Sequence, residues 1–433
     1  MSNPRTSYQE YTFPRDVCPV CEKASLYSSQ NEVCEAIVIG SEELTNVGLL
    51  RKRRWSCNNT MRHNLLILGK ENINCMSFQE MEQSGALFIT AKTGFSMKYL
   101  QLTFLRLMRA KAAPGQEAAV LGIFHKDDDR MFWRQQTTTD HLLHALEAFA
   151  IAKSKPSEVL QFNLNYPAKH MNLLRKDIIF EPPESVTALA FDGHFGIHRA
   201  LCDGVEAPCT VRKKGHPRKL PQEHQRSCSC KAKDVQRLAL PQRTAGWQFV
   251  LDPDSRRVLA AGEHLQNETN EDKASLVEKV LKLPGMKVDL LLHDDACHFE
   301  KYVKRNNLEA FSSVKHYVVD AFHAPNHKCS KRYWTGAVKK RCAKVRANIP
   351  EVFNAWIRSL NFFFNGLRPH SHKFWVAEAC KFYNNNLQDV PLKIGRRKNV
   401  VARKSVHKRP GAKAQKKPAA VAKTQRKPAA ARL

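Results

Sequence analysis

Short apolar runs alternate with amphipathic helical patterns between about residues 185 and 390, and this order constrains the fold more than any other feature. The runs that predict buried strands are residues 186–191, 247–251, 257–261, 288–292 and 316–319. The second and third runs flank an Asp-Pro-Asp-Ser turn and predict a hairpin. Helical patterns cover residues 271–283, the segment through Phe299 and Tyr302, and a last helix that starts near Glu351. The order predicts an α/β domain over residues 181–390, with a mixed sheet and flanking helices.

Two regions precede this domain. Residues 1–84 hold five of the 13 cysteines and one strand-like run at 36–40, which predicts a cysteine-containing N-terminal module. Residues 85–180 show helical periodicity, with one helix expected over 97–110 and another from about Thr139 or Asp140 to Lys153. We therefore expect a helical domain between the cysteine module and the α/β domain.

A basic tail, residues 391–433, follows the α/β domain. From residue 390 onward there are fifteen Lys and Arg residues and no acidic residue, in a chain of net charge +29. The tail has too few apolar residues for a core, so we expect it to be disordered; it either binds phosphates in a salt-dependent way or only solubilises the chain. Together with a polar insert at about 207–243, it supplies the residues expected to bind nucleic acid: Lys213, Lys214, Arg396, Arg397, Lys398, Lys416 and Lys417. Short basic clusters of this kind also favour import into the nucleus.

No stretch approaches 18 consecutive apolar residues, so the sequence predicts no membrane span. The first fourteen residues are polar and lack the apolar segment of a secretion signal. The cysteines are therefore expected as reduced thiols or metal ligands. These features favour an intracellular protein whose partner is DNA.

Two predicted strands of the α/β domain are each followed by an aspartate, Asp192 and Asp294. Strand ends of an open sheet meet at one edge, and Glu351, in the opening turn of the last helix, is a third candidate carboxylate. Their mutual repulsion would be relieved by two Mg²⁺ or Mn²⁺ ions, which can clamp the oxygens of a phosphodiester. We therefore take the three as candidate catalytic residues and metal ligands. The alternatives are a strand-ending turn at Asp192 and a helix-dipole role for Glu351.

Three sets of cysteines and histidines are candidate zinc ligands. In the first, Cys18 and Cys21 form a CxxC pair, with Cys57 and one of Cys34, Cys75 or His63 as further ligands. The second comprises Cys297, His323, His327 and Cys329, and the third comprises Cys228 and Cys230 with Cys202 or Cys209. The alternative is that the thiols are packed as small apolar groups and the histidines hydrogen-bond within the fold.

Several segments of the α/β domain resemble the Kyakuja–Dileera–Zisupton (KDZ) transposases. Residues 191–199 (FDGHFGIHR) are similar to the first-aspartate motif of the family, and residues 293–299 (HDDACHF) are similar to the second. Residues 319–329 look like the following block, in which an Asp, two His and a Cys recur, and residues 348–356 look like the third-carboxylate helix. Phe374-Trp375 and Tyr383-Asn384 match later landmarks, so that the resemblance covers about residues 185–386.

The resemblance implies an RNase H-like fold and DDE chemistry, with Asp192, Asp294 and Glu351 as the triad. Such an enzyme hydrolyses DNA at the ends of a transposable element, using divalent metal, and then joins the 3′-hydroxyl to target DNA. The expected partners are DNA and, on the DNA ends, further copies of the chain. The alternatives are a domesticated relative that binds DNA through its zinc sites and tail without cutting it, and a nuclease of the same fold without strand transfer.

Overall fold

The computed structural model describes residues 9–22, 26–53, 59–125, 135–174, 176–200, 243–265, 268–319, 323–343 and 345–389. They belong to one unit that spans residues 1–394, whereas residues 395–433 form a second unit. The basic tail and the insert at 207–243 therefore lie outside the described residues, apart from Arg243. No helix in the described ranges is long and apolar enough to cross a membrane.

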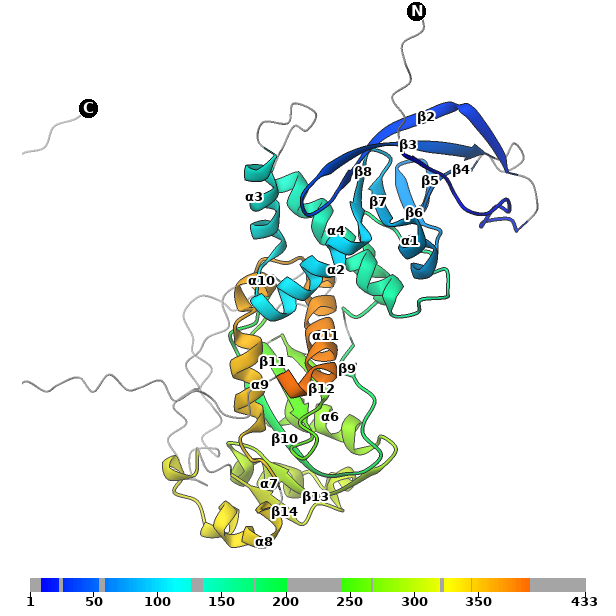
Figure 1. Cartoon of the computed structure of the whole chain (residues 1–433). Helices are drawn as coiled ribbons and strands as arrows, with labels where there is room; N and C mark the ends of the chain where they lie inside the picture. The colour runs from blue at the N-terminus through cyan, green and yellow to red at the C-terminus, as the bar shows by residue number, and fades with distance from the viewer. Residues whose placement is uncertain are drawn as a thin grey trace, which may run out of the picture. The chain divides into compact units, whose positions relative to one another are not determined.

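An eight-stranded sheet forms the N-terminal part of the described chain (Figure 1). Its strands are β1 (Gln9–Tyr11), β2 (Tyr27–Ile39), β3 (Leu44–Arg53), β4 (Thr60–Arg62), β5 (Leu65–Leu68), β6 (Glu71–Asn74), β7 (Ala86–Thr90) and β8 (Thr93–Ser96). The order is β6-β5-β4-β3-β2-β8-β7, and β1 pairs with β3. Asn72 of β6 donates from Nδ2 to the carbonyl of Ile89 in β7 at 3.2 Å, which joins the two ends of this path. Asn64, in the turn between β4 and β5, also contacts β7, because it accepts from the backbone N–H of Phe88 at 2.8 Å and donates to its carbonyl at 2.9 Å. The sheet is thus nearly closed.

Two strands of this sheet occupy a segment that the sequence assigned to helices. Residues 85–96 were expected to open the helical domain, but Ala86–Thr90 and Thr93–Ser96 form β7 and β8. Gly85 ends α1 (Phe78–Ser84) in a left-handed conformation, with φ of 83°, and so turns the chain into β7. The first four residues of β7 are all buried, and a short apolar run of this kind does not distinguish strand from helix.

The expected helices begin after these strands. Residues 97–110 form α2 (Met97–Leu105) and a π-helical turn (Arg106–Ala110), followed by α3 (Pro114–Phe124) and α4 (Gln135–Lys153). Phe104 of α2 lies 6.2 Å from the ring of Phe149 and 6.0 Å from the ring of Trp375. These helices share one hydrophobic core with the N-terminal sheet and with the last helix of the chain.

A second sheet carries the predicted α/β pattern. Its strands are β9 (Ile178–Ile179), β10 (Val186–His194), β11 (Gly246–Leu251), β12 (Val258–His264), β13 (Met286–Leu292) and β14 (His316–Val318), in the order β14-β13-β10-β11-β12-β9. Strands β13 and β14 run parallel to β10, whereas β11 is antiparallel to both β10 and β12. The predicted mixed sheet is therefore confirmed.

Helices cover both faces of this sheet (Figure 1). They are α6 (Asn270–Leu281), α7 (Ala296–Arg305), α8 (Lys339–Cys342), α9 (Ile349–Arg358), α10 (Asn361–Asn365) and α11 (Pro369–Asn385). Val250 and Leu259 pack with the core of α6 and α7, whereas Phe249 packs on Phe353 of α9. The helix expected near Glu351 is α9, and two further helices follow it.

A buried ion cluster ties the last helix to this sheet. Glu263 of β12 lies 2.8 Å from Nε of Arg199 and 3.2 Å from Nζ of Lys373 in α11, and the side chains of Arg199 and Glu263 are 0% and 1% exposed. Burying three charges costs free energy unless they compensate one another. The cluster thereby restricts how α11 can pack on the sheet.

Candidate active site and metal centre

Asp192 and Asp294 reach the same level of the second sheet because of the strand register. Ala190 of β10 pairs with Leu292 of the parallel strand β13, and each aspartate lies two residues further along its chain. Asp192 is still within β10 and on the face of Ala190, whereas β13 ends at Leu292 and Asp294 lies in the turn that follows it. The two carboxylates nevertheless line the same cavity, although about a hundred residues separate them in sequence.

Asp192 is half-buried and held by two hydrogen bonds. Nδ2 of Asn354 in α9 donates to Oδ2 at 2.7 Å, and the backbone N–H of Gly193 donates to Oδ1 at 2.8 Å. Burial raises the pKa of Asp192 well above its ordinary value, and the charges of Asp294 and Glu351 raise it further. A cation placed between these carboxylates would therefore be strongly favoured.

Asp294 lies two residues after the end of β13 and contacts the residue before it, His293. Its Oδ1 lies 3.0 Å from Nδ1 of His293, whose ring stacks on Phe191 with centroids 4.4 Å apart. Burial raises the pKa of Asp294, but His293 and the charge of Lys273 lower it by more, so that the net shift is downward. Asp294 is thus the carboxylate that stays ionised beside Asp192.

Glu351 completes the set from the first turn of α9. Asp192, Asp294 and Glu351 line one small cavity of about 10 Å³, together with Phe191, Leu292, His293, Ala347 and Pro350. That volume holds about one water-sized particle. The structure therefore brings the three predicted carboxylates around one cavity, although their oxygen atoms do not form one set within 4.8 Å among the described residues.

A buried lysine that the sequence analysis did not single out supports this cavity. Nζ of Lys273 in α6 lies 3.0 Å from Nε2 of His293, 3.5 Å from Glu268 and 4.0 Å from Asp295. Nζ of Lys273 is within hydrogen-bond distance of Nε2 of His293, and Nδ1 of the same ring faces the carbonyl of Phe191 at 3.0 Å. Lys273 thereby orients His293 and compensates the surrounding carboxylates.

Two supporting residues, Lys273 and Asn354, could have been identified from the sequence pattern. Lys273 precedes Leu276, Val277 and Val280 by three, four and seven residues, which places a lysine on the apolar face of α6. Asn354 follows Glu351 by three residues and therefore lies on the same face of α9. A lysine on the apolar face of a helix, and an amide on the same face as a candidate catalytic carboxylate, both need polar partners, which is the signal that could have identified them.

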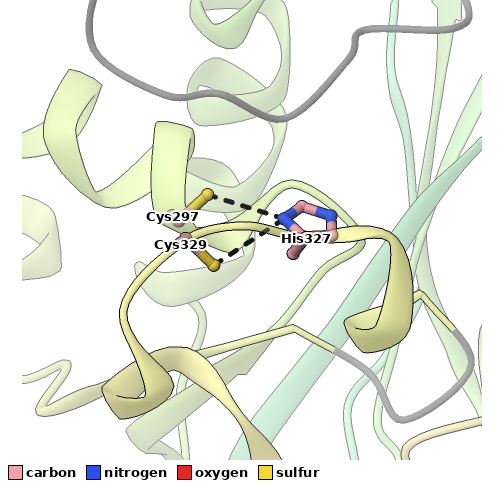
Figure 2. Close-up of side chains that lie close together, drawn as sticks. All are labelled: Cys297, His327 and Cys329. Atoms are coloured by element: carbon pink, nitrogen blue, oxygen red, sulfur yellow. Dashed lines mark hydrogen bonds between the residues drawn. The ribbon is translucent and has the colours of Figure 1, made fainter.

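A second cluster, of candidate zinc ligands, includes Cys297, three residues after Asp294. Nδ1 of His327 is 3.7 Å from Sγ of Cys297 and 3.8 Å from Sγ of Cys329. Both contacts are drawn as dashed lines in Figure 2. All three ligand atoms lie within 4.8 Å of one another, so the group can hold a metal ion. The fourth residue of the predicted set, His323, lies elsewhere, with Nδ1 3.6 Å from Oε1 of Glu351. The structure therefore brings together three of the four predicted ligands.

The N-terminal cysteines give no comparable cluster among the described residues. Cys18 is buried and Cys21 half-buried, whereas their predicted partner Cys57 lies outside the described residues. Cys34 contacts the carbonyl of Ala91 with its Sγ at 3.4 Å. His63 binds Asn64 with Nδ1 and Ser84 with Nε2, so both of its ring nitrogens already have protein partners.

The other candidates, Cys228, Cys230 and the seven basic residues expected to bind nucleic acid, lie outside the described residues. No known protein-family model and no curated protein matches this sequence significantly, and no solved structure matches this fold significantly.

Proposed function

We propose that this chain is a DNA transposase of the DDE type, resembling the KDZ group, with an RNase H-like catalytic domain. The observation that carries the proposal is the single cavity that Asp192, Asp294 and Glu351 line from three distant segments. The strand order β14-β13-β10-β11-β12, with β11 the antiparallel strand, supports the RNase H-like assignment.

The donor set fits a hard divalent cation. Carboxylate oxygens are the ligands that Mg²⁺ and Mn²⁺ prefer, and the pKa of Asp192 is raised first by burial and then by repulsion from Asp294 and Glu351, which a cation would offset. When bound, two such ions would stabilise the attacking and departing oxygens of a phosphodiester. Asp192, Asp294 and Glu351 would hold the ions, while Asn354 and His293 keep two of these carboxylates in place.

We propose DNA as the substrate and the nucleus as the location, because the basic tail and the insert concentrate cationic charge in segments poor in apolar residues. Assembly of further copies on the DNA ends belongs to the same proposal. We also propose that the cluster of Cys297, His327 and Cys329 holds a structural zinc ion, since thiolate and imidazole suit that metal.

The test is cleavage of duplex DNA that carries the sequences flanking the gene, in the presence of Mg²⁺ or Mn²⁺. We expect the wild type to cleave, and we expect Asp294→Asn and Glu351→Gln to lose on the order of 10²-fold or more of the rate. Glu309→Gln, which removes an exposed carboxylate that does not line the cavity, should cleave like the wild type. Tight DNA binding without cleavage by the wild type would instead support the domesticated alternative, and equal cleavage by all variants would refute the site.

A further inference from the structure

Cys297 takes part in two groups of metal-ligating atoms. On one side, its Sγ lies within 4.8 Å of the ligand atoms of His327 and Cys329 (Figure 2). On the other side, it lies within 4.8 Å of the ligand atoms of Asp295 and His298. Cys297 and His298 are the second and third residues of α7, and Asp295 is its N-cap. Three protein ligands with a histidine beside them as a candidate fourth ligand can form a closed metal site.

The ring of His298 is already oriented by a carboxylate. Its Nδ1 lies 2.8 Å from Oδ1 of Asp295. Its Nε2 is buried and has no hydrogen-bond partner among the described residues. Metal-binding histidines commonly have this arrangement, in which a carboxylate accepts from one ring nitrogen and leaves the other with its lone pair toward the metal.

We propose that His298 is the fourth ligand of a zinc ion bound by Cys297, His327 and Cys329, and that Asp295 positions its ring. The resulting Cys₂His₂ set is typical of structural zinc, which takes four protein ligands in a tetrahedron. The four ligand atoms do not yet form one set within 4.8 Å, so binding draws the ring of His298 toward the other three. A buried imidazole nitrogen without a partner gains from that movement.

His323, the ligand that spacing alone suggests, has a different neighbour. Its Nδ1 lies 3.6 Å from Glu351, which lines the carboxylate cavity. The zinc ion would therefore fasten the segment 323–329 to the start of α7, immediately after Asp294. One structural metal would hold both Asp294 and His323 in place without touching the cavity itself.

The experiment measures zinc bound by the purified full-length chain, together with the affinity in competition with a chelator. Cys329→Ser identifies the site, because it should remove one equivalent of zinc relative to the wild type. His298→Ala should lose the same equivalent or bind it at least about 10²-fold more weakly, whereas the matched variant His323→Ala should keep it. Asp295→Asn should weaken binding by about 10- to 100-fold. Replacing zinc with Co²⁺ should give the visible spectrum of a tetrahedral site with two thiolates.

His298→Cys controls for misfolding, since it retains a zinc ligand and should restore the lost equivalent. The proposal is overturned if His298→Ala keeps wild-type zinc affinity, or if His323→Ala loses the equivalent instead. It is also overturned if Cys329→Ser leaves the zinc content unchanged. Because none of these measurements uses DNA, absence of cleavage would contradict the proposed function and leave this inference intact.

Discussion

Replacing Asp192 by asparagine tests the repulsion within the carboxylate cavity, and it requires no DNA substrate. The folded state raises the pKa of this carboxyl, so ionisation at neutral pH destabilises the fold by about 1.4 kcal/mol for each unit of the shift. Asp192→Asn removes that cost. We therefore expect the variant to unfold at a higher temperature than the wild type when metal is chelated.

The opposing cost of the substitution is small. An amide has one oxygen, so at most one of the two hydrogen bonds to Asp192 is lost, at about 1 kcal/mol. Oδ1 of Asn354 is buried and has no partner among the described residues, so a flip of its amide would let it accept from the new side chain. The stabilisation therefore prevails wherever the shift in the pKa of Asp192 exceeds one unit.

The stability difference between Asp192→Asn and the wild type should depend on pH in a way that identifies ionisation of Asp192 as its cause. Below about pH 4 the carboxyl is protonated in both states, so the wild type carries no ionisation cost. As the pH rises from there toward the raised folded pKa, only the unfolded state releases the proton, and the wild type loses stability. The advantage of Asp192→Asn should therefore grow as the pH rises from about 4 toward the raised folded pKa, and stay constant above it.

The assay is thermal unfolding in EDTA across this pH range, followed by titration with Mg²⁺. An ion at one hundred times its Kd adds about 2.7 kcal/mol to the wild type, and the variant should gain less. Glu309→Gln, at an exposed position, should follow the wild type in both experiments. A variant that is less stable than the wild type at every pH would refute the reasoning, because burial and the neighbouring carboxylates would then not destabilise the ionised form of Asp192.

Three further changes test other parts of the structure. Lys273→Met leaves Glu268 and Asp295 without their shared cation, so we expect denaturant titration to show a loss of about 3 kcal/mol, and unchanged stability would contradict the network. Glu263→Gln leaves two cations uncompensated in the buried cluster and should cost about 3–5 kcal/mol by the same measurement, well above an exposed control. Deleting residues 390–433 should flatten the salt dependence of DNA binding. If six charges of this segment contact phosphates, the intact chain loses on the order of 10³-fold in affinity between 50 and 200 mM salt. An equally steep fall in affinity with salt after the deletion would show that the tail does not contact DNA.

The sequence predicted the second sheet well because its central strands are buried on both faces. Such strands are continuous apolar runs, and those of β10 and β13 start and end within three residues of the expected positions. The N-terminal sheet was missed because its strands carry charged residues, as at Lys52 and Arg53 in β3. Its closure depends on the side chains of Asn72 and Asn64, which contact β7 across 17 and 24 residues, and no local pattern reports such contacts.

At the site, the order of strands and helices could be predicted from the sequence, whereas the directions of the side chains could not. Chain order was enough to predict that Asp192, Asp294 and Glu351 meet, because strand ends and helix starts have defined places in such a sheet. Ligand spacing was not enough to separate His298 from His323. Proximity in sequence does not show where an imidazole points, and the contacts of His298 with Asp295 and of His323 with Glu351 are the basis on which we propose His298.

Helix α9 carries Glu351 and Asn354 one turn apart, and Asn354 is bonded to Asp192. A helix is stiff over this length, so the spacing between Asp192 and Glu351 depends on how α9 packs against β10 as well as on side-chain rotamers. The same helix bears Trp356, which packs on Phe353 and Tyr383 and whose indole lies under the ammonium of Lys111 at 4.1 Å. Any shift of α9 would change the surroundings of this indole as well, so we expect the fluorescence of Trp356 to respond to a change in the spacing of the two carboxylates.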